Sequence, residues 1–155
     1  MGSGKSTIGA EIAKGLNRPF FDIDIEIEKN MGMSIFDIFN QMGEAGFRKI
    51  EAEYCKKAAA LHNTIIATGG GCVELPENIK ILQNSSVIIY LQADPETIFL
   101  RTAGSARPLL NSTDKMSKIQ NLLARRKHLY EAAAHHTIDA NKPIFDVLAG
   151  LHTYI

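Results

Sequence analysis

The sequence predicts an α/β domain whose parallel sheet is covered by helices on both faces. Short apolar runs, such as those at 64–68 and 86–91, alternate with helical patterns along the chain, as they do in βαβ units. A glycine-rich segment at 2–7 runs directly into a helical pattern, which is a second mark of this class. The length of 155 residues and the hydrophobic content of 45% fit one domain with a sizeable core.

Charge and cysteine content exclude several classes of function. Seventeen basic and seventeen acidic residues cancel, so the chain has no overall electrostatic reason to bind nucleic acid or membrane surfaces. Cys55 and Cys72 lack the spacing of a disulfide or zinc framework, and the five histidines show no ligand spacing. No apolar run approaches the ~20 residues of a transmembrane helix, and no signal-peptide pattern opens the chain. We therefore expect a cytoplasmic protein that binds neither nucleic acid nor membranes.

The segment at 2–7 matches the end of the phosphate-binding loop G-x-x-x-x-G-K-[ST]. Its glycines let backbone N–H groups point at phosphate oxygens, and the helix that follows presents its positive end to them. We expect Lys5 to reach the β- and γ-phosphates and the Ser6 hydroxyl to bind Mg²⁺. The alternative is a flexible turn that only caps a helix, which we disfavour because a helical pattern over 8–16 follows at once.

The phosphate-binding loop is incomplete in this sequence. The leading glycine of the motif would lie five positions before Gly4, upstream of Met1. Such a loop is preceded by a strand, which is central in sheets of this kind. We therefore expect the natural protein to carry about eight further residues, enough for a strand of ~5 residues and the start of the loop. The remaining strands are expected at 19–24, 64–68, 86–91 and 137–139.

Two carboxylates close the apolar run at 19–24. Asp22 and Asp24 would point to the same side if the strand continues that far, and ligands bind at this end of open parallel sheets. One carboxylate would then lie near Mg²⁺ and the other would accept a proton from a substrate hydroxyl. An acidic cap on the following helix, at 25–30, is an equal alternative on position alone.

A pair of charged residues lies on the next helical segment. A capping-box pattern at 34–37 predicts a short helix that ends near residue 43, followed by a longer helix over 44–61. On the longer helix, Arg48 and Glu51 are three residues apart and share a face. Taken alone, Arg48 is most simply a solvated surface partner of Glu51 or Glu44.

The glycine triplet at 69–71 directly follows the strand expected at 64–68. Three glycines at the carboxyl end of a strand let a ligand approach bare backbone. A tight turn needs at most one or two of them, so a turn alone explains the triplet only in part.

Two later segments carry arginines. The segment at 103–112 mixes small residues with Arg107, as a mobile loop over a site does, and an ordinary surface loop is the alternative. A long helix capped by Asp114 or Thr113 carries a basic turn at 125–127. A basic turn of this kind is usually a solvated face.

Together these segments resemble the shikimate kinase family over essentially the whole chain. Each segment alone is weak or moderate, whereas other P-loop small-molecule kinases do not combine D-x-D, G-E-x-x-F-R, G-G-G and R-P-L-L. The segments that carry the resemblance are GSGKST at 2–7, FDID at 21–24, GEAGFRKIE at 43–51, GGG at 69–71, RPLL at 107–110 and RKHLY at 126–130.

The resemblance implies a P-loop kinase with a three-layer αβα architecture. Its five-stranded parallel sheet would have the strand order 2-3-1-4-5, with the first, central strand absent from the given sequence. It also implies a single domain over 1–155, with a substrate-binding helical region at about 25–60 and a lid at about 102–113. We expect a monomer.

The activity that the resemblance implies is Mg²⁺-dependent transfer of the ATP γ-phosphate to the 3-hydroxyl of shikimate, a step of chorismate and aromatic amino-acid biosynthesis. The catalytic residues would be Lys5, Asp24 and Arg107. The nucleotide would contact Gly2, Ser3, Gly4, Lys5, Ser6, Thr7, Arg101, Arg107 and Asn141. Shikimate would contact Asp24, Arg48, Glu51, Gly69, Gly70, Gly71 and Arg126, and Mg²⁺ would contact Ser6 and, through water, Asp22.

Two alternatives differ from this interpretation in function. Another P-loop small-molecule kinase, for example one acting on gluconate or a nucleoside monophosphate, would not need two arginines aimed at one carboxylate. A nucleotide-binding module would use the same fold for sensing without turnover, but the presence of Lys5, Asp24 and Arg126 argues against it.

Overall fold

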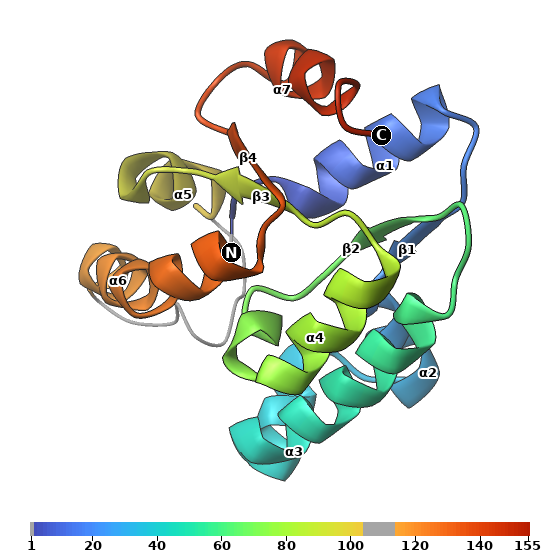
Figure 1. Cartoon of the computed structure of the whole chain (residues 1–155). Coiled ribbons are helices and arrows are strands. Elements are labelled where there is room, and N and C mark those ends of the chain that lie inside the picture. The colour runs from blue at the N-terminus through green and yellow to red at the C-terminus, as the bar shows by residue number, and fades with distance from the viewer. Residues whose placement is uncertain (1, 104–113) are drawn as a thin grey trace.

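The computed structural model describes residues 2–103 and 114–155, and Figure 1 shows their arrangement. Helices and strands alternate along the chain as the sequence predicts. In chain order the elements are α1 (Lys5–Gly15), β1 (Phe20–Asp22), α2 (Ile23–Met31), α3 (Ile35–Ala59), β2 (Ile65–Ala67), the 3₁₀ helix η1 (Cys72–Glu74), α4 (Pro76–Ser85), β3 (Ile89–Gln92), α5 (Pro95–Arg101), α6 (Lys115–Ala133), β4 (His136–Asp139) and α7 (Ile144–Leu151).

The strands form two parallel pairs. β1 pairs with β2, with Phe20 opposite Ile65, and β3 pairs with β4, with Ile89 opposite His136. An order of 2-3-1-4-5 without its first strand leaves the same two pairs, so this part of the fold prediction is confirmed. The described residues contain four strands and not five. A largely apolar cavity of about 510 Å³, lined by residues of β2 and of β3, lies where the expected order puts the further strand.

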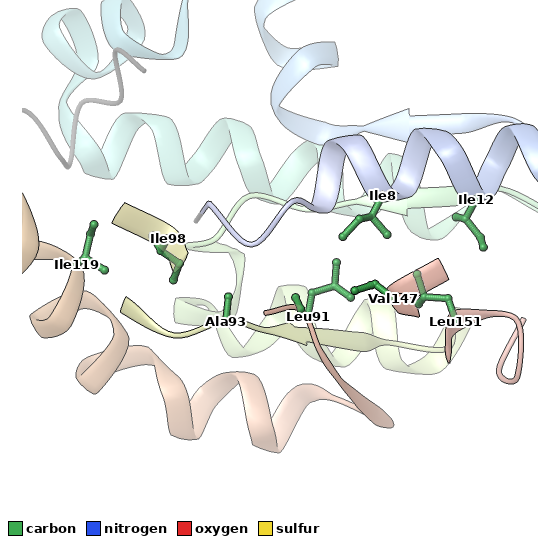
Figure 2. Close-up of a cluster of buried hydrophobic side chains, with 9 residues drawn as sticks. Ile8, Ile12, Leu91, Ala93, Ile98, Ile119, Val147 and Leu151 are labelled. Atoms are coloured by element: carbon green, nitrogen blue, oxygen red, sulfur yellow. The ribbon is translucent and has the colours of Figure 1, made fainter. Parts of the chain in front are cut away.

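Helices cover the strands from both sides. In Figure 1, α1 and α7 lie on one side of the strands, and α3 and α4 lie on the other. Figure 2 shows Ile8 and Ile12 of α1 pointing toward Leu91 of β3 and toward Val147 and Leu151 of α7. The two isoleucines are one helical turn apart, so a single face of α1 enters this core.

A second core lies between α2, α3 and α4. Its fully buried members include Ile23, Ile27 and Ile38. Cys55 and Cys72 also lie in this core as free thiols, with their Sγ atoms 3.2 Å apart. This core holds α3 against η1 and therefore fixes the glycine turn that precedes η1.

Local signals set several boundaries. Ser34 caps α3, since its hydroxyl accepts a hydrogen bond from the backbone N–H of Asp37, as the capping-box pattern predicts. Gly43 interrupts α3 with a φ of 69°, so the predicted break near this residue is confirmed. The helix predicted over 44–61 ends earlier than expected, because α3 ends at Ala59 and Leu61 lies beyond it and is exposed.

The structure describes only a small part of the region in which the lid is expected. Most of the lid expected at about 102–113, including Arg107, lies outside the described residues.

Within residues 2–103 and 114–155, no helix is long and apolar enough to cross a membrane. The same residues contain no cluster of three or more histidine, cysteine or acidic side chains that could hold a metal ion.

Candidate active site

A cavity of about 590 Å³ lies at the amino end of α1 and at the carboxyl ends of β1 and β2. Ligands bind at this end of the strands in open parallel sheets. The cavity brings together most of the residues that the sequence singles out. Those that line it are Gly2, Gly4, Lys5, Ser6, Thr7, Asp22, Asp24, Arg48, Glu51, Gly69, Gly70, Gly71 and Arg126.

The phosphate-binding loop has the backbone that its glycines allow. Gly2 and Gly4 have φ values of 64° and 91°, in the left-handed region that favours glycine. α1 begins at Lys5, directly after Gly4, so the amino end of the helix lies at the cavity. Ser3 is buried and does not line this cavity.

Asp22 joins the loop to the next strand. Its Oδ2 accepts a 2.6 Å hydrogen bond from the Ser6 hydroxyl. Its Oδ1 accepts hydrogen bonds from the backbone N–H groups of Asp24 and Ile25, at 3.0 and 3.3 Å. Asp22 is therefore a helix cap and a neighbour of the phosphate loop at once, so the two interpretations of this carboxylate do not exclude each other.

Asp24 reaches the cavity from a helix. The expectation that Asp22 and Asp24 share one side of a strand is wrong, because β1 ends at Asp22 and Asp24 lies in the first turn of α2. The strand ends there because the Asp22 side chain satisfies the first backbone N–H groups of α2. A Cβ atom on Gly69 would lie 2.9 Å from Asp24 Oδ1 and 2.5 Å from Glu51 Oε1. The two carboxylates thus approach the bare backbone of the glycine turn.

Arg48 is buried in a network of carboxylates. It lies 2.7 Å from Glu51, 3.0 Å from Glu44 and 3.2 Å from Glu74. The expected pairing with Glu51 or Glu44 is confirmed, but only 12% of the Arg48 side chain is exposed, so the expectation that it is solvated is wrong. A Cβ atom on Gly71 would collide with its guanidinium, so any other residue at this position would displace the end of the Arg48 side chain.

The electrostatics of this network follow from burial and pairing. Burial raises the pKa of Glu51 and the contact with Arg48 lowers it, with a net rise. Burial alone would lower the pKa of Arg48, but its contacts with Glu51, Glu44 and Glu74 together outweigh this effect and the pKa is raised. Arg48 therefore stays charged in the cavity wall.

Arg126 enters the cavity from α6. It is 2% exposed, so the interpretation of the basic turn as a solvated face is wrong for this residue, although it fits Arg125, whose side chain is 59% exposed. One turn further along α6, the Tyr130 hydroxyl donates a 2.6 Å hydrogen bond to the carbonyl of Gly70. This bond ties the glycine turn to the helix that carries Arg126.

Two buried polar atoms of the cavity wall have no hydrogen-bond partner among the described residues. They are Oε1 of Glu51 and Nε of Arg126. A buried polar atom without a partner costs about 1–3 kcal/mol. Because both side chains line the cavity, the cost indicates that a polar ligand completes their hydrogen bonds.

Glu74 is a part of the site that the sequence does not signal. It ends η1, and its Oε2 lies 2.8 Å from Arg126 Nη2 and 3.2 Å from Arg48 Nη2. Its only sequence mark is its place three residues after the glycine triplet. Further residues that line the cavity lie within the region at about 25–60, where the sequence predicts a substrate-binding helical region but singles out none of them as site residues; they include Glu28, Ser34, Phe36 and Phe39.

Two residues expected to contact the nucleotide, Arg101 and Asn141, are not among the residues that line the cavity. Arg101 Nη1 donates a 3.3 Å hydrogen bond to the carbonyl of Ser3, so Arg101 lies against the phosphate loop. Asn141 bridges the ends of β3 and β4, because its Oδ1 accepts from the backbone N–H of Asp94 and its Nδ2 donates to Asp139. Asp94 occupies the cap position of α5, but its side chain makes no capping hydrogen bond among the described residues.

Comparisons with known sequences find shikimate kinases as relatives of this chain. A family model described as shikimate kinase matches residues 1–149. A shikimate kinase of Burkholderia pseudomallei is 41% identical over 152 residues, which cover 97% of this chain and 83% of that relative. One of Symbiobacterium thermophilum is 42% identical over 153 residues, which cover 96% of this chain and 88% of that relative.

Solved structures have the same fold. A shikimate kinase of Acinetobacter baumannii in complex with shikimate has a TM-score of 0.95 and 34% identity, and the match covers 99% of this chain and 87% of that one. A shikimate kinase of Bacteroides thetaiotaomicron has a TM-score of 0.91 and 29% identity, over 99% of this chain and 92% of that one. The chain therefore belongs to the shikimate kinase family.

Proposed function

We propose that this chain transfers the γ-phosphoryl group of ATP to the 3-hydroxyl of shikimate, and that the cavity at the end of α1 is where the transfer takes place. The ATP-dependent kinase activity is supported by membership of the shikimate kinase family. The observation that carries the assignment of the cavity is the meeting of Arg48 and Arg126, from two different helices, beside the phosphate-binding loop.

The two arginines form the proposed site for the shikimate carboxylate. A guanidinium presents N–H donors in a planar fork that matches both oxygens of a carboxylate. Their ability to bind such a group is supported by the carboxylate of Glu74, which contacts both. Glu51 holds Arg48 through a 2.7 Å contact and thereby orients its fork.

The opposite end of the cavity forms the proposed ATP site. The amino end of α1 and Lys5 offer positive charge to the phosphates. The Ser6 hydroxyl and the Asp22 carboxylate, 2.6 Å apart, are hard oxygen donors of the kind that Mg²⁺ prefers, so they would hold this ion. Bound Mg²⁺ neutralises phosphate charge during transfer. Arg101, Asn141 and Arg107 remain proposed nucleotide contacts, and Arg101 is supported by its contact with Ser3.

Asp24 is the proposed partner of the attacking hydroxyl. It lies between the two ends, against the turn that contains Gly69 and near Glu51. Phosphoryl transfer depends on positioning and on neutralising charge, and Asp24 would orient the acceptor hydroxyl and take its proton. The turn at 69–71 brings backbone to the acceptor, and the helical region at about 25–60 supplies Arg48, Glu51 and further walls of its site.

The test is ADP release with shikimate, gluconate and a nucleoside monophosphate as parallel acceptors, each with ATP and Mg²⁺. We expect ADP release with shikimate and none above background with the others. Release with gluconate alone would overturn the acceptor, and shikimate binding without ADP release would identify a nucleotide-binding module.

The quaternary state and the compartment belong to the same proposal. We propose a cytoplasmic monomer whose partners are small molecules. Its two free, buried cysteines support a reducing compartment. Size-exclusion chromatography with light scattering measures the mass in solution, and a dimer mass would contradict the proposed monomer.

A further inference from the structure

The carboxylate of Glu74 lies between the arginines that are proposed to bind the substrate carboxylate. Its Oε2 contacts Arg126 Nη2 at 2.8 Å and Arg48 Nη2 at 3.2 Å, and its Oε1 contacts Arg125 Nη2 at 2.5 Å. We propose that Glu74 is an internal competitor for the substrate carboxylate and sets the affinity of the enzyme for shikimate. This inference rests on the proposed carboxylate site of Arg48 and Arg126.

Glu74 is the movable member of this cluster. Its side chain is 22% exposed, against 3% for Arg126, 12% for Arg48 and 0% for Glu51. It ends a short 3₁₀ helix, whereas its arginine partners lie inside long helices. Entry of a second carboxylate therefore displaces Glu74 more easily than it displaces either arginine.

A ligand carboxylate can make a hydrogen bond to Arg126 that Glu74 does not make. Glu74 reaches Arg126 only at Nη2, and Arg126 Nε has no hydrogen-bond partner among the described residues. Nε and Nη2 lie on one edge of a guanidinium, where a carboxylate binds with two parallel hydrogen bonds. A substrate carboxylate that takes this edge makes a bond that Glu74 does not make, so the substrate wins the competition once it is present in excess.

Glu74 keeps a partner after displacement. Arg125, on the outer side of α6, is 59% exposed and contacts the other oxygen of Glu74. The displaced carboxylate can therefore stay paired with Arg125 and need not be left buried without a counter-charge. Burial raises the pKa of Glu74, but Arg126, Arg125 and Arg48 together lower it by more, so Glu74 is ionised at neutral pH and competes as an anion.

The test compares Glu74→Gln with the matched control Glu77→Gln. Glu77 lies on the exposed side of α4, outside the arginine cluster, and its replacement removes the same charge. For Glu74→Gln we expect the shikimate Kd, measured by calorimetry without nucleotide, to fall about three- to tenfold. The control is expected to keep the wild-type Kd and KM.

A neutral acceptor separates competition from a general change in the site. With the carboxamide analogue of shikimate, we expect KM to fall less in Glu74→Gln than it does with shikimate, because a neutral group gains less from the guanidinium charge that Glu74 leaves free. A Kd for shikimate that is unchanged or raised in Glu74→Gln overturns the inference, since a residue that prearranges the arginines would give that result. Glu74→Ala, checked by its melting temperature, provides a second variant with the same expected fall in Kd.

Failure of this inference is distinguishable from failure of the proposed function. If Arg126→Ala weakens shikimate binding but Glu74→Gln does not strengthen it, the carboxylate site stands and the competition is overturned. If Arg126→Ala leaves the shikimate Kd unchanged, the carboxylate site itself is wrong and the inference falls with it.

Discussion

The two ends of the cavity are built in different ways. The phosphate end consists of neighbours in sequence, the segment at 2–7, joined to one carboxylate, Asp22. The acceptor end is assembled from α2, α3, the turn at 69–71 and α6. The phosphate end therefore depends on a local backbone motif, whereas the acceptor end depends on packing between distant elements.

This difference predicts different kinetic consequences of substitution. A change at the phosphate end removes charge that acts on the transferred group, so it lowers kcat. A change at the acceptor end removes contacts that shikimate makes before and during transfer, so it acts mainly on KM. Three substitutions test this division, from the largest expected effect to the smallest, and a fourth tests how the acceptor end contributes to stability.

Lys5→Met is expected to have the largest effect. The loss of the ammonium group from the amino end of α1 should lower kcat about 10²- to 10³-fold, while the shikimate Kd stays near the wild-type value. Lys14→Met is the matched control, because Lys14 lies exposed in the last turn of the same helix. Steady-state kinetics and calorimetry measure both quantities. A variant that loses shikimate affinity together with kcat would break the division between the two ends.

Asp24→Asn tests the residue between the two ends. The amide keeps the shape of the carboxylate but cannot take the proton of the acceptor hydroxyl, so we expect kcat to fall about 10²-fold. Glu26→Gln, on the same helix, is the control, because Glu26 makes a surface pair with Lys29 and does not line the cavity. Turnover at the wild-type rate in Asp24→Asn would remove Asp24 from the catalytic role.

Arg126→Ala sharpens the comparison at the acceptor end. Removal of the buried guanidinium should raise the shikimate KM about tenfold to a hundredfold, which corresponds to the free energy of hydrogen bonds to charged groups. The change in kcat should be smaller. Lys127→Ala is the control, because Lys127 is the next residue along α6 and is 57% exposed. If kcat and kcat/KM fell equally and KM stayed unchanged, Arg126 would act on the transferred phosphoryl group, as residues of the phosphate end do, and not on shikimate binding.

The same division explains what could be predicted from the sequence. The loop at 2–7, the cap at Ser34 and the break at Gly43 depend on neighbouring residues, and the structure contains each of them as expected. The pairing of the strands also follows the expected order. These features depend on short-range backbone chemistry, which a sequence displays directly.

Features that arise from distant packing were predicted poorly from the residues alone. Arg48 and Arg126 look like solvated surface residues on their own helices, and only the docking of α3, η1 and α6 buries them. Glu74 carries no local signal, because its role comes from arginines on two other helices. The end of β1 at Asp22 was missed for another reason, since a capping side chain competes with continuation of the strand.

The smallest expected effect concerns stability and comes from Glu51, the buried carboxylate of the acceptor end. Burial raises its pKa despite the contact with Arg48, so the native state binds this proton more readily than the unfolded state. Its contribution to the free energy of unfolding is therefore full below the unfolded pKa and is lost as the pH rises through the raised native pKa. In Glu51→Gln the side chain is neutral at every pH. The unfolding free energy of wild type minus that of the variant, measured by urea denaturation, should thus decrease between about pH 4 and pH 7. If this difference instead increased over the same pH range, pairing with Arg48 would outweigh burial for Glu51. The charges of the acceptor end would then stabilise the fold, as those of the phosphate end are expected to do when ATP is bound.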